Sequence, residues 1–263
     1  MCQNFETMKT KLSFFLMLLI SMLMMTACGG DDPEPAPAPT PTPVDTTSTE
    51  KPDPTPSVKA CQGWPEAYGG VMLQAFYWDS FDDTQWSVLE QQADQMAGTF
   101  DLVWLPQSGN CGGTSMGYDD LYWFENYNSS FGNEQQLRSL ISTFKAKGIK
   151  TIADVVINHR RNLSNWVDFP RETYKGVTYE MKSTDICAND DGGKTNTWAQ
   201  SNGYELSSNN DTGEGWDGMR DLDHKSENVQ TNVKAYLKML LEDLGYIGFR
   251  YESHQWIYNR FKF

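Results

Sequence analysis

Two apolar stretches of this sequence end on polar side chains whose types suit chemistry. The stretch 149–157 leads into Asn158 and His159, and the stretch 246–249 leads into Arg250, which stands two residues before Glu252. The planar fork of an arginine can orient a neighbouring carboxylate and keep it ionised. For Arg250 a purely structural salt bridge is the alternative, and for His159 an ordinary buried histidine. The spacing therefore predicts a polar site if both stretches end at the same place.

The elements that must position these side chains follow an alternating pattern. Each apolar, β-branched run predicts a buried strand, and each set of apolar residues at helical spacing predicts a helix packed on one side. The predicted strands cover 71–78, 102–106, 149–157 and 246–251, and the predicted helices cover 84–97, the segment between Asn133 and Gly148, and the segment between Ser226 and Gly245. Alternation of this kind is typical of an α/β fold with a parallel sheet, whose ligands bind at the carboxyl ends of the strands.

Residues 160–225 differ from the rest of the folded part. They are polar, rich in Asn, Asp and Gly, and contain no long periodic run. A stretch of this length without regular elements is usually functional or a small inserted domain. We therefore expect an insertion between the third strand and the next helix.

The amino-terminal residues are predicted to direct export. Residues 1–28 carry lysines, an apolar run and then Met25–Cys28, which resembles the lipobox of bacterial lipoproteins. The run is short for a membrane-spanning helix, so a lipid anchor at Cys28 is the expected attachment to a bacterial membrane, on its periplasmic side or at the cell surface. Residues 29–58, rich in Pro and Thr, are predicted to be a disordered linker.

Composition excludes some classes of partner. The net charge of −14 argues against nucleic acid, because neutralising phosphates requires a basic surface. Beyond Cys28 the chain contains Cys61, Cys111 and Cys187. An exported protein could form one disulfide from these three, and no spacing among them indicates a zinc site.

Four separated stretches together resemble the α-amylase family of glycoside hydrolases, and most closely its plant-type members. They are Trp104–Pro106 with Gly117–Tyr118, then 154–159, 221–224 and 248–252. The resemblance implies the N-terminal half of a (β/α)₈ TIM barrel with a loop-rich domain B inserted after strand 3. Residues 59–159 would be barrel domain A with strands 1–3, residues 160–225 domain B, and residues 226–252 helix 3 and strand 4.

The resemblance also implies roles for single residues. Retaining glycosidases use two carboxyl groups, a nucleophile and a proton donor, and members of this family cleave α-1,4-glucans such as starch and maltooligosaccharides. Glu252 stands at the nucleophile position, where the family has Asp, and Arg250 at the position of its supporting arginine. His159 resembles the ligand of a sugar hydroxyl and Tyr118 the aromatic that stacks on the sugar. Asp154 resembles a structural carboxylate that positions the arginine.

Domain B of this family usually binds calcium. Resemblance to the plant-type pattern places ligands at Asn158, Asp211, the carbonyl of Glu214, and Asp221. Hard oxygen ligands of this kind suit calcium. A solvated, turn-rich loop is the alternative, since Asn and Asp favour turns.

The sequence departs from the family at two places. Glu252 has one methylene more than Asp, whereas catalytic geometry tolerates roughly 0.5 Å. Residues 253–263 form a tail that matches nothing expected there, and the general acid of strand five and the His-Asp pair of strand seven have no positions in the sequence. We therefore expect an incomplete, inactive copy, truncated or frameshifted, of an enzyme of this family. A non-catalytic cell-surface glucan-binding protein is the alternative.

Overall fold

The computed structural model describes residues 69–211 and 218–252. The predicted signal, the linker, Cys28, Cys61, Glu214 and the tail 253–263 lie outside these residues. Within the described ranges no helix is long and apolar enough to cross a membrane.

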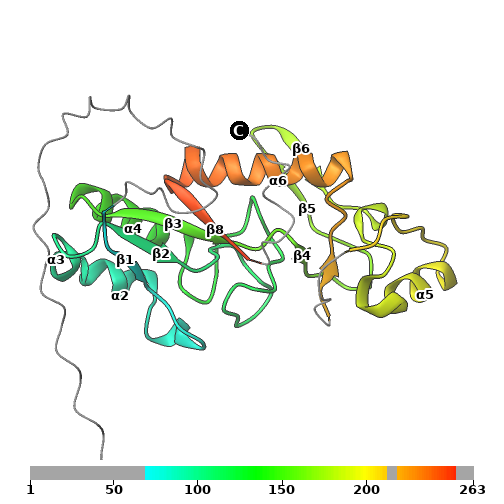
Figure 1. Ribbon diagram of the computed structural model, residues 1–263, viewed down its shortest axis with the longest axis horizontal. Helices are drawn as coiled ribbons and strands as arrows, with labels where there is room; N and C mark the ends of the chain where they lie inside the picture. Colours follow the sequence, from blue (N-terminus) through cyan, green and yellow to red (C-terminus); the bar gives the residue numbers. More distant parts are fainter. Residues whose placement is uncertain (1–68, 212–217, 253–263) are drawn as a thin grey trace, which may run out of the picture. The chain divides into compact units, whose positions relative to one another are not determined.

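Four parallel strands form the central sheet, as the alternating pattern predicts (Figure 1). They are β1 (Met72–Gln74), β2 (Leu102–Leu105), β3 (Lys150–Val155) and β8 (Gly248–Tyr251), in the order β1-β2-β3-β8. These are barrel strands of a (β/α)₈ fold in chain order. Because neighbouring strands are parallel, their carboxyl ends lie at one edge of the sheet.

All four strands are shorter than predicted, and β1 and β3 end more than one residue early. β1 ends at Gln74 instead of residue 78, and the chain then turns at Asp79, which has φ 62° and precedes a short 3₁₀ turn at Ser80–Asp82. Tyr77 and Trp78 therefore lie in a loop, 56% and 65% exposed. β3 ends at Val155, so Asn158 and His159 belong to the chain that leaves the strand.

The helix boundaries follow local capping signals. α4 (Glu134–Ala146) begins after Asn133, which forms a capping box with Gln136, and α6 (Glu227–Met239) begins after Ser226, whose side chain accepts from two helix amides. Both starts confirm the prediction. The predicted helix 84–97 is instead two short helices, α2 (Trp86–Gln91) and α3 (Ala93–Met96). α6 continues as a π-helical turn, Leu240–Leu244, before Gly245 ends it at φ 90°.

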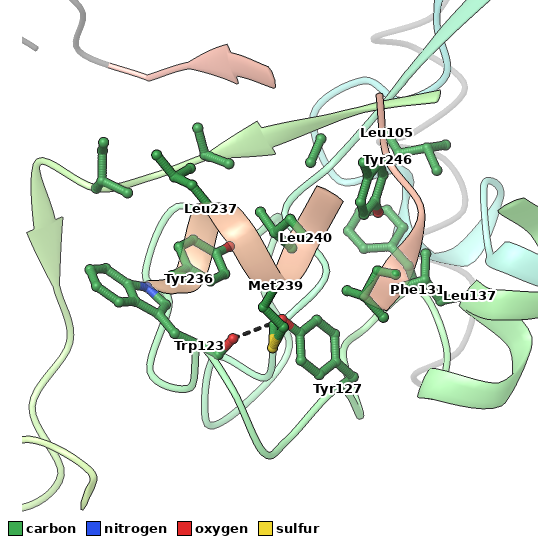
Figure 2. Packing of buried hydrophobic residues seen from close by; sticks show 14 of the residues in the cluster. Leu105, Trp123, Tyr127, Phe131, Leu137, Tyr236, Leu237, Met239, Leu240 and Tyr246 are labelled. Carbon is green, nitrogen blue, oxygen red and sulfur yellow. Dashed lines mark hydrogen bonds between the residues drawn. The ribbon is translucent and has the colours of Figure 1, made fainter. Parts of the chain in front are cut away.

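Buried aromatic and aliphatic side chains join α6 to the loop after β2 (Figure 2). Trp123 stacks on Tyr236 with ring centroids 4.9 Å apart, and the Tyr127 hydroxyl donates to the Trp123 carbonyl over 2.7 Å. Trp123, Tyr236 and Leu237 are at most 1% exposed. This packing fixes the long loop 107–132 on the helix that precedes β8.

The predicted insertion contains short regular elements that sequence periodicity did not reveal. These are β4 (His159–Arg160), the hairpin β5 (Arg171–Tyr174) and β6 (Val177–Glu180), 3₁₀ turns at Ser183–Asp185 and Asp190–Gly193, α5 (Lys194–Ser201), and β7 (Arg220–Asp221). β4 pairs with β7 antiparallel, with His159 opposite Asp221. The entry and the exit of the insertion are thereby joined beside the end of β3.

Candidate active site

Strand register places a carboxylate beside the predicted arginine. Asp154 on β3 stands opposite Arg250 on β8. Arg250 Nη1 donates to Asp154 Oδ1 over 3.1 Å, and the same nitrogen donates to the Glu252 carboxylate. The guanidinium carbon of Arg250 lies 5.0 Å from the centroid of the Trp104 ring. One arginine thus joins two carboxylates above an aromatic face.

The two carboxylates that Arg250 binds differ in how deeply they are buried. The Asp154 side chain is 2% exposed, while those of Arg250 and Glu252 are 35% and 28% exposed. Burial raises the pKa of Asp154 to about 6, although the nearby positive charge of Arg250 opposes the rise. Burial acts to lower the pKa of Arg250, but Asp154 and Glu252 outweigh it and the net shift is upward. Asp154 therefore acts as the inner anchor of the arginine, and Glu252 is the carboxylate that a solute can approach.

A glycine allows the loop after β2 to present Tyr118. Gly117 has φ 106°, and a Cβ at this position would stand 2.8 Å from the Cβ of Gln107. Only glycine fits both constraints. Burial, then the negative charges of Asp154 and Glu252, raise the pKa of Tyr118 to about 12. Tyr118 therefore lies beside the arginine and its two carboxylates as a neutral phenol.

His159 binds the backbone of the same loop. Its Nε2 lies 2.8 Å from the Tyr118 carbonyl oxygen, which makes the imidazole the donor. Burial lowers the pKa of His159, so the ring is neutral near pH 7. The structure thus brings together the four residues that the sequence assigns to catalysis and sugar binding: Tyr118, His159, Arg250 and Glu252.

Trp78 is a site residue that the sequence did not single out. Its ring stacks on Tyr118 with centroids 6.1 Å apart and an interplanar angle of 12°. The aromatic run Phe76-Tyr77-Trp78 was the available signal, but it was interpreted as part of a strand. The two stacked rings, of which Trp78 is mostly exposed, lie beside the carboxyl ends of the strands.

Three of the predicted calcium ligands fall among the described residues. Asn158 Nδ2 lies 3.4 Å from Asp221 Oδ1. Burial, then the negative charges of Asp190 and Asp211, raise the pKa of Asp221 to about 7. A divalent cation at Asp221 would relieve this repulsion, and it would require the Asn158 amide to turn its oxygen toward Asp221. Across residues 69–211 and 218–252, no three His, Cys, Asp or Glu side chains form a group that could hold a metal ion, so the amide and the backbone carbonyl are essential to the predicted set.

The cysteines do not form the disulfide that their number allows within the described residues. Cys111 and Cys187 are both free and buried. Burial raises the pKa of both thiols far above the usual range, so they are neutral thiols in the core.

Fold and site together define a class: a parallel α/β barrel protein with an arginine–carboxylate site at the carboxyl ends of its strands, as in barrel glycoside hydrolases. A family model described as alpha amylase, catalytic domain, matches residues 100–262, more than half of the chain. The chain belongs to the α-amylase family.

Curated relatives of the chain carry the names of amylases and of a related glucan hydrolase. Alpha-amylase 3, chloroplastic, from Arabidopsis thaliana is 26% identical over 205 residues, which are 74% of this chain and 20% of that protein. Glucan 1,4-alpha-maltotetraohydrolase from Roseateles saccharophilus is 31% identical over 105 residues, 35% of this chain and 19% of that protein. The chain thus spans about a fifth of each. An alpha-amylase structure from H.orenii covers 70% of this chain and 40% of its own at 18% identity, with a TM-score of 0.44.

Proposed function

We propose that this chain carries the site of a retaining glycoside hydrolase for α-1,4-glucans, in a form that binds glucan without cleaving it. The observation that carries the proposal is the contact of Arg250 Nη1 with both Asp154 and Glu252, next to Tyr118. In a retaining mechanism a carboxylate attacks the sugar from one side, and it must be ionised to do so. Arg250 donates a hydrogen bond to Glu252, the carboxylate at that position.

Tyr118 and Trp78 supply the apolar surface that a sugar ring needs. Trp78 is 65% exposed, and its stack on Tyr118 continues the aromatic surface toward solvent. Aromatic side chains combine a flat apolar face with little conformational freedom to lose, so they bind rigid ring ligands well. Together they would hold a glucan over the Glu252 carboxylate.

Cleavage is not expected because Glu252 stands where the family has Asp. The longer Glu252 side chain reaches Arg250 directly, and its position differs from that of an Asp by about one bond length, beyond the roughly 0.5 Å that catalytic geometry tolerates. The other neighbouring carboxylate, Asp154, binds the inner side of Arg250 and is too buried to protonate a glycosidic oxygen. The site therefore has a nucleophile position without a matched proton donor among the described residues.

The 263-residue chain is expected to show no starch hydrolysis above a Glu252→Ala control. The reason is that Glu252 displaces the nucleophilic carboxylate from the position an Asp would give it, while attack on the sugar requires close geometry. Release of reducing ends from soluble starch measures this directly. A wild-type rate clearly above that of Glu252→Ala would contradict the proposed loss of cleavage.

We also propose calcium at Asn158, Asp211, the Glu214 carbonyl and Asp221. Millimolar calcium is expected to raise the melting temperature by a few degrees, about what roughly 1 kcal/mol produces in a domain of this size. Asp221→Asn should abolish most of the rise, whereas the exposed Asp94→Asn should leave it unchanged. Thermal unfolding followed by circular dichroism, with calcium or with chelator, tests this. An equal calcium effect in wild type and Asp221→Asn would contradict the site.

The predicted lipid anchor at Cys28 would hold this site at a bacterial membrane, on the periplasmic side or at the cell surface. The linker 29–58 would then set its distance from the lipid.

A further inference from the structure

A buried ion pair, Arg160 with Glu172, lies in the insertion and is not part of the candidate site. Arg160 Nη2 and Glu172 Oε1 are 3.2 Å apart, and each side chain is 1% exposed. Removing two charges from water is costly, and a buried ion pair is weak evidence for stability on its own. What the pair binds besides itself therefore matters.

Glu172 binds three consecutive backbone amides of the loop after β2. Its carboxylate accepts from Trp123 N at 3.0 and 3.1 Å, from Phe124 N at 2.7 Å and from Glu125 N at 3.0 Å. Successive N–H groups that converge on one carboxylate fix the backbone path of the segment that supplies them. The loop is thus attached to the start of the β5–β6 hairpin.

Arg160 binds the same loop from the other side. Its Nη2 donates to the Leu121 carbonyl, and its guanidinium carbon lies 4.2 Å from the centroid of the Trp123 ring. The next residue, Arg161, donates its backbone N–H to the Asp120 carbonyl over 3.1 Å. Residues 120–125 are therefore held between two parts of the insertion.

These contacts act on the candidate site through its two nearest neighbours in the chain. Arg160 directly follows His159, and residues 120–125 begin two residues after Tyr118. The His159 Nε2 and the Tyr118 carbonyl are 2.8 Å apart, so this hydrogen bond bridges the same two chain segments. A shift of residues 120–125 relative to Arg160 is therefore expected to act on that distance.

We propose that Arg160 and Glu172 are positioning residues that set Tyr118 against His159 and so determine how tightly the site binds an α-1,4-glucan. The part about glucan affinity rests on the proposed function, while the part about the Tyr118–His159 contact does not. If the pair only stabilised the insertion, its loss would lower the melting temperature. The Tyr118–His159 contact and the glucan affinity of the folded protein would then stay unchanged.

The test uses the full chain and three variants. Glu172→Gln removes the charge and replaces one of the two acceptor oxygens by an NH2 group, which cannot accept from the backbone amides. Arg160→Lys keeps the charge beside Glu172 and is the milder change, but a single ammonium cannot also hold the Leu121 carbonyl and lie flat on Trp123. The control is Glu125→Gln. Glu125 joins the same loop to the same hairpin, accepting from Thr173 N over 2.6 Å, and an amide oxygen can keep that bond.

Two quantities are measured for each variant. The first is the ¹⁵N resonance of the imidazole of His159, assigned by its absence in His159→Gln among the three histidines of the chain. The second is the affinity for maltoheptaose by titration calorimetry. We expect Arg160→Lys and Glu172→Gln to shift the His159 Nε2 resonance and to weaken binding by about three- to tenfold, and Glu125→Gln to change neither.

The outcomes separate the two claims. If Arg160→Lys unfolds cooperatively but keeps both the wild-type resonance and the wild-type affinity, the positioning role is wrong. If wild type binds no maltoheptaose, the proposed function fails, and the His159 resonance still decides whether the pair positions the contact. Should Glu172→Gln fail to fold, the result for Arg160→Lys decides alone.

Discussion

Replacing Arg250 by methionine is expected to lower the free energy of unfolding at pH 7 by about 2 to 3 kcal/mol. The change leaves the Asp154 carboxylate, 2% exposed, without the positive charge of Arg250. The estimate lies below the range for fully buried pairs because the Arg250 side chain is 35% exposed and its charge is partly screened. Loss of the Arg250 contact with the Trp104 ring adds to the effect.

The effect of Arg250→Met should depend on pH with a definite sign. Burial raises the folded pKa of Asp154 to about 6, above its unfolded value, so the folded chain holds an extra proton between about pH 4 and pH 6. Stability from this group therefore falls as pH rises through that range. Without Arg250 the pKa should rise further, so the loss should be larger at pH 8 than at pH 5.

Urea unfolding of wild type, Arg250→Met and Arg250→Lys at pH 5 and at pH 8 measures this effect. The double variant Arg250→Met with Asp154→Asn is the matched control, since it removes the uncompensated charge and should recover part of the loss. A double variant no more stable than Arg250→Met would show that Asp154 and Arg250 are not coupled.

Truncating Tyr118 to alanine is expected to weaken maltoheptaose binding by about ten- to thirtyfold, or about 1.4 to 2 kcal/mol. The ring forms the inner half of the aromatic surface, and Trp78 stacks on it at 6.1 Å. Its removal would also leave Trp78 without the neighbour that orients it. Titration calorimetry gives the affinity of each protein.

Tyr204→Ala is the control for this change. Tyr204 is an exposed aromatic of the insertion, 43% exposed, and it stacks on Trp198 without contact to the candidate site. It should bind maltoheptaose as wild type does. Equal losses in the two variants would mean that the aromatic surface at Tyr118 is not the binding site.

Local signals in the sequence predicted much of the fold. Asn133 and Ser226 cap helices where their side chains indicate, because capping depends on a few neighbouring residues. The parallel sheet followed from the alternation of apolar runs. The end of β1 was predicted wrongly, since the apolar aromatic run Phe76–Trp78 continues past Gln74, where pairing with β2 ends.

The candidate site was predicted less evenly. Tyr118, His159, Arg250 and Glu252 could be named because family resemblance marks them. Trp78 and the Arg160–Glu172 pair could not, because their contacts join residues 40 and 12 positions apart through tertiary packing that no local pattern encodes. The roles of the named residues, and calcium at Asn158, Asp211, Glu214 and Asp221, stay predictions.

Titration of the wild-type chain with maltoheptaose, beside cellohexaose as a glucan with the other linkage, tests the central claim most directly. The account predicts saturable binding of maltoheptaose that Tyr118→Ala weakens at least about tenfold, with no comparable binding of cellohexaose. Absence of maltoheptaose binding in folded wild-type protein, or equal affinity for both glucans, would contradict it.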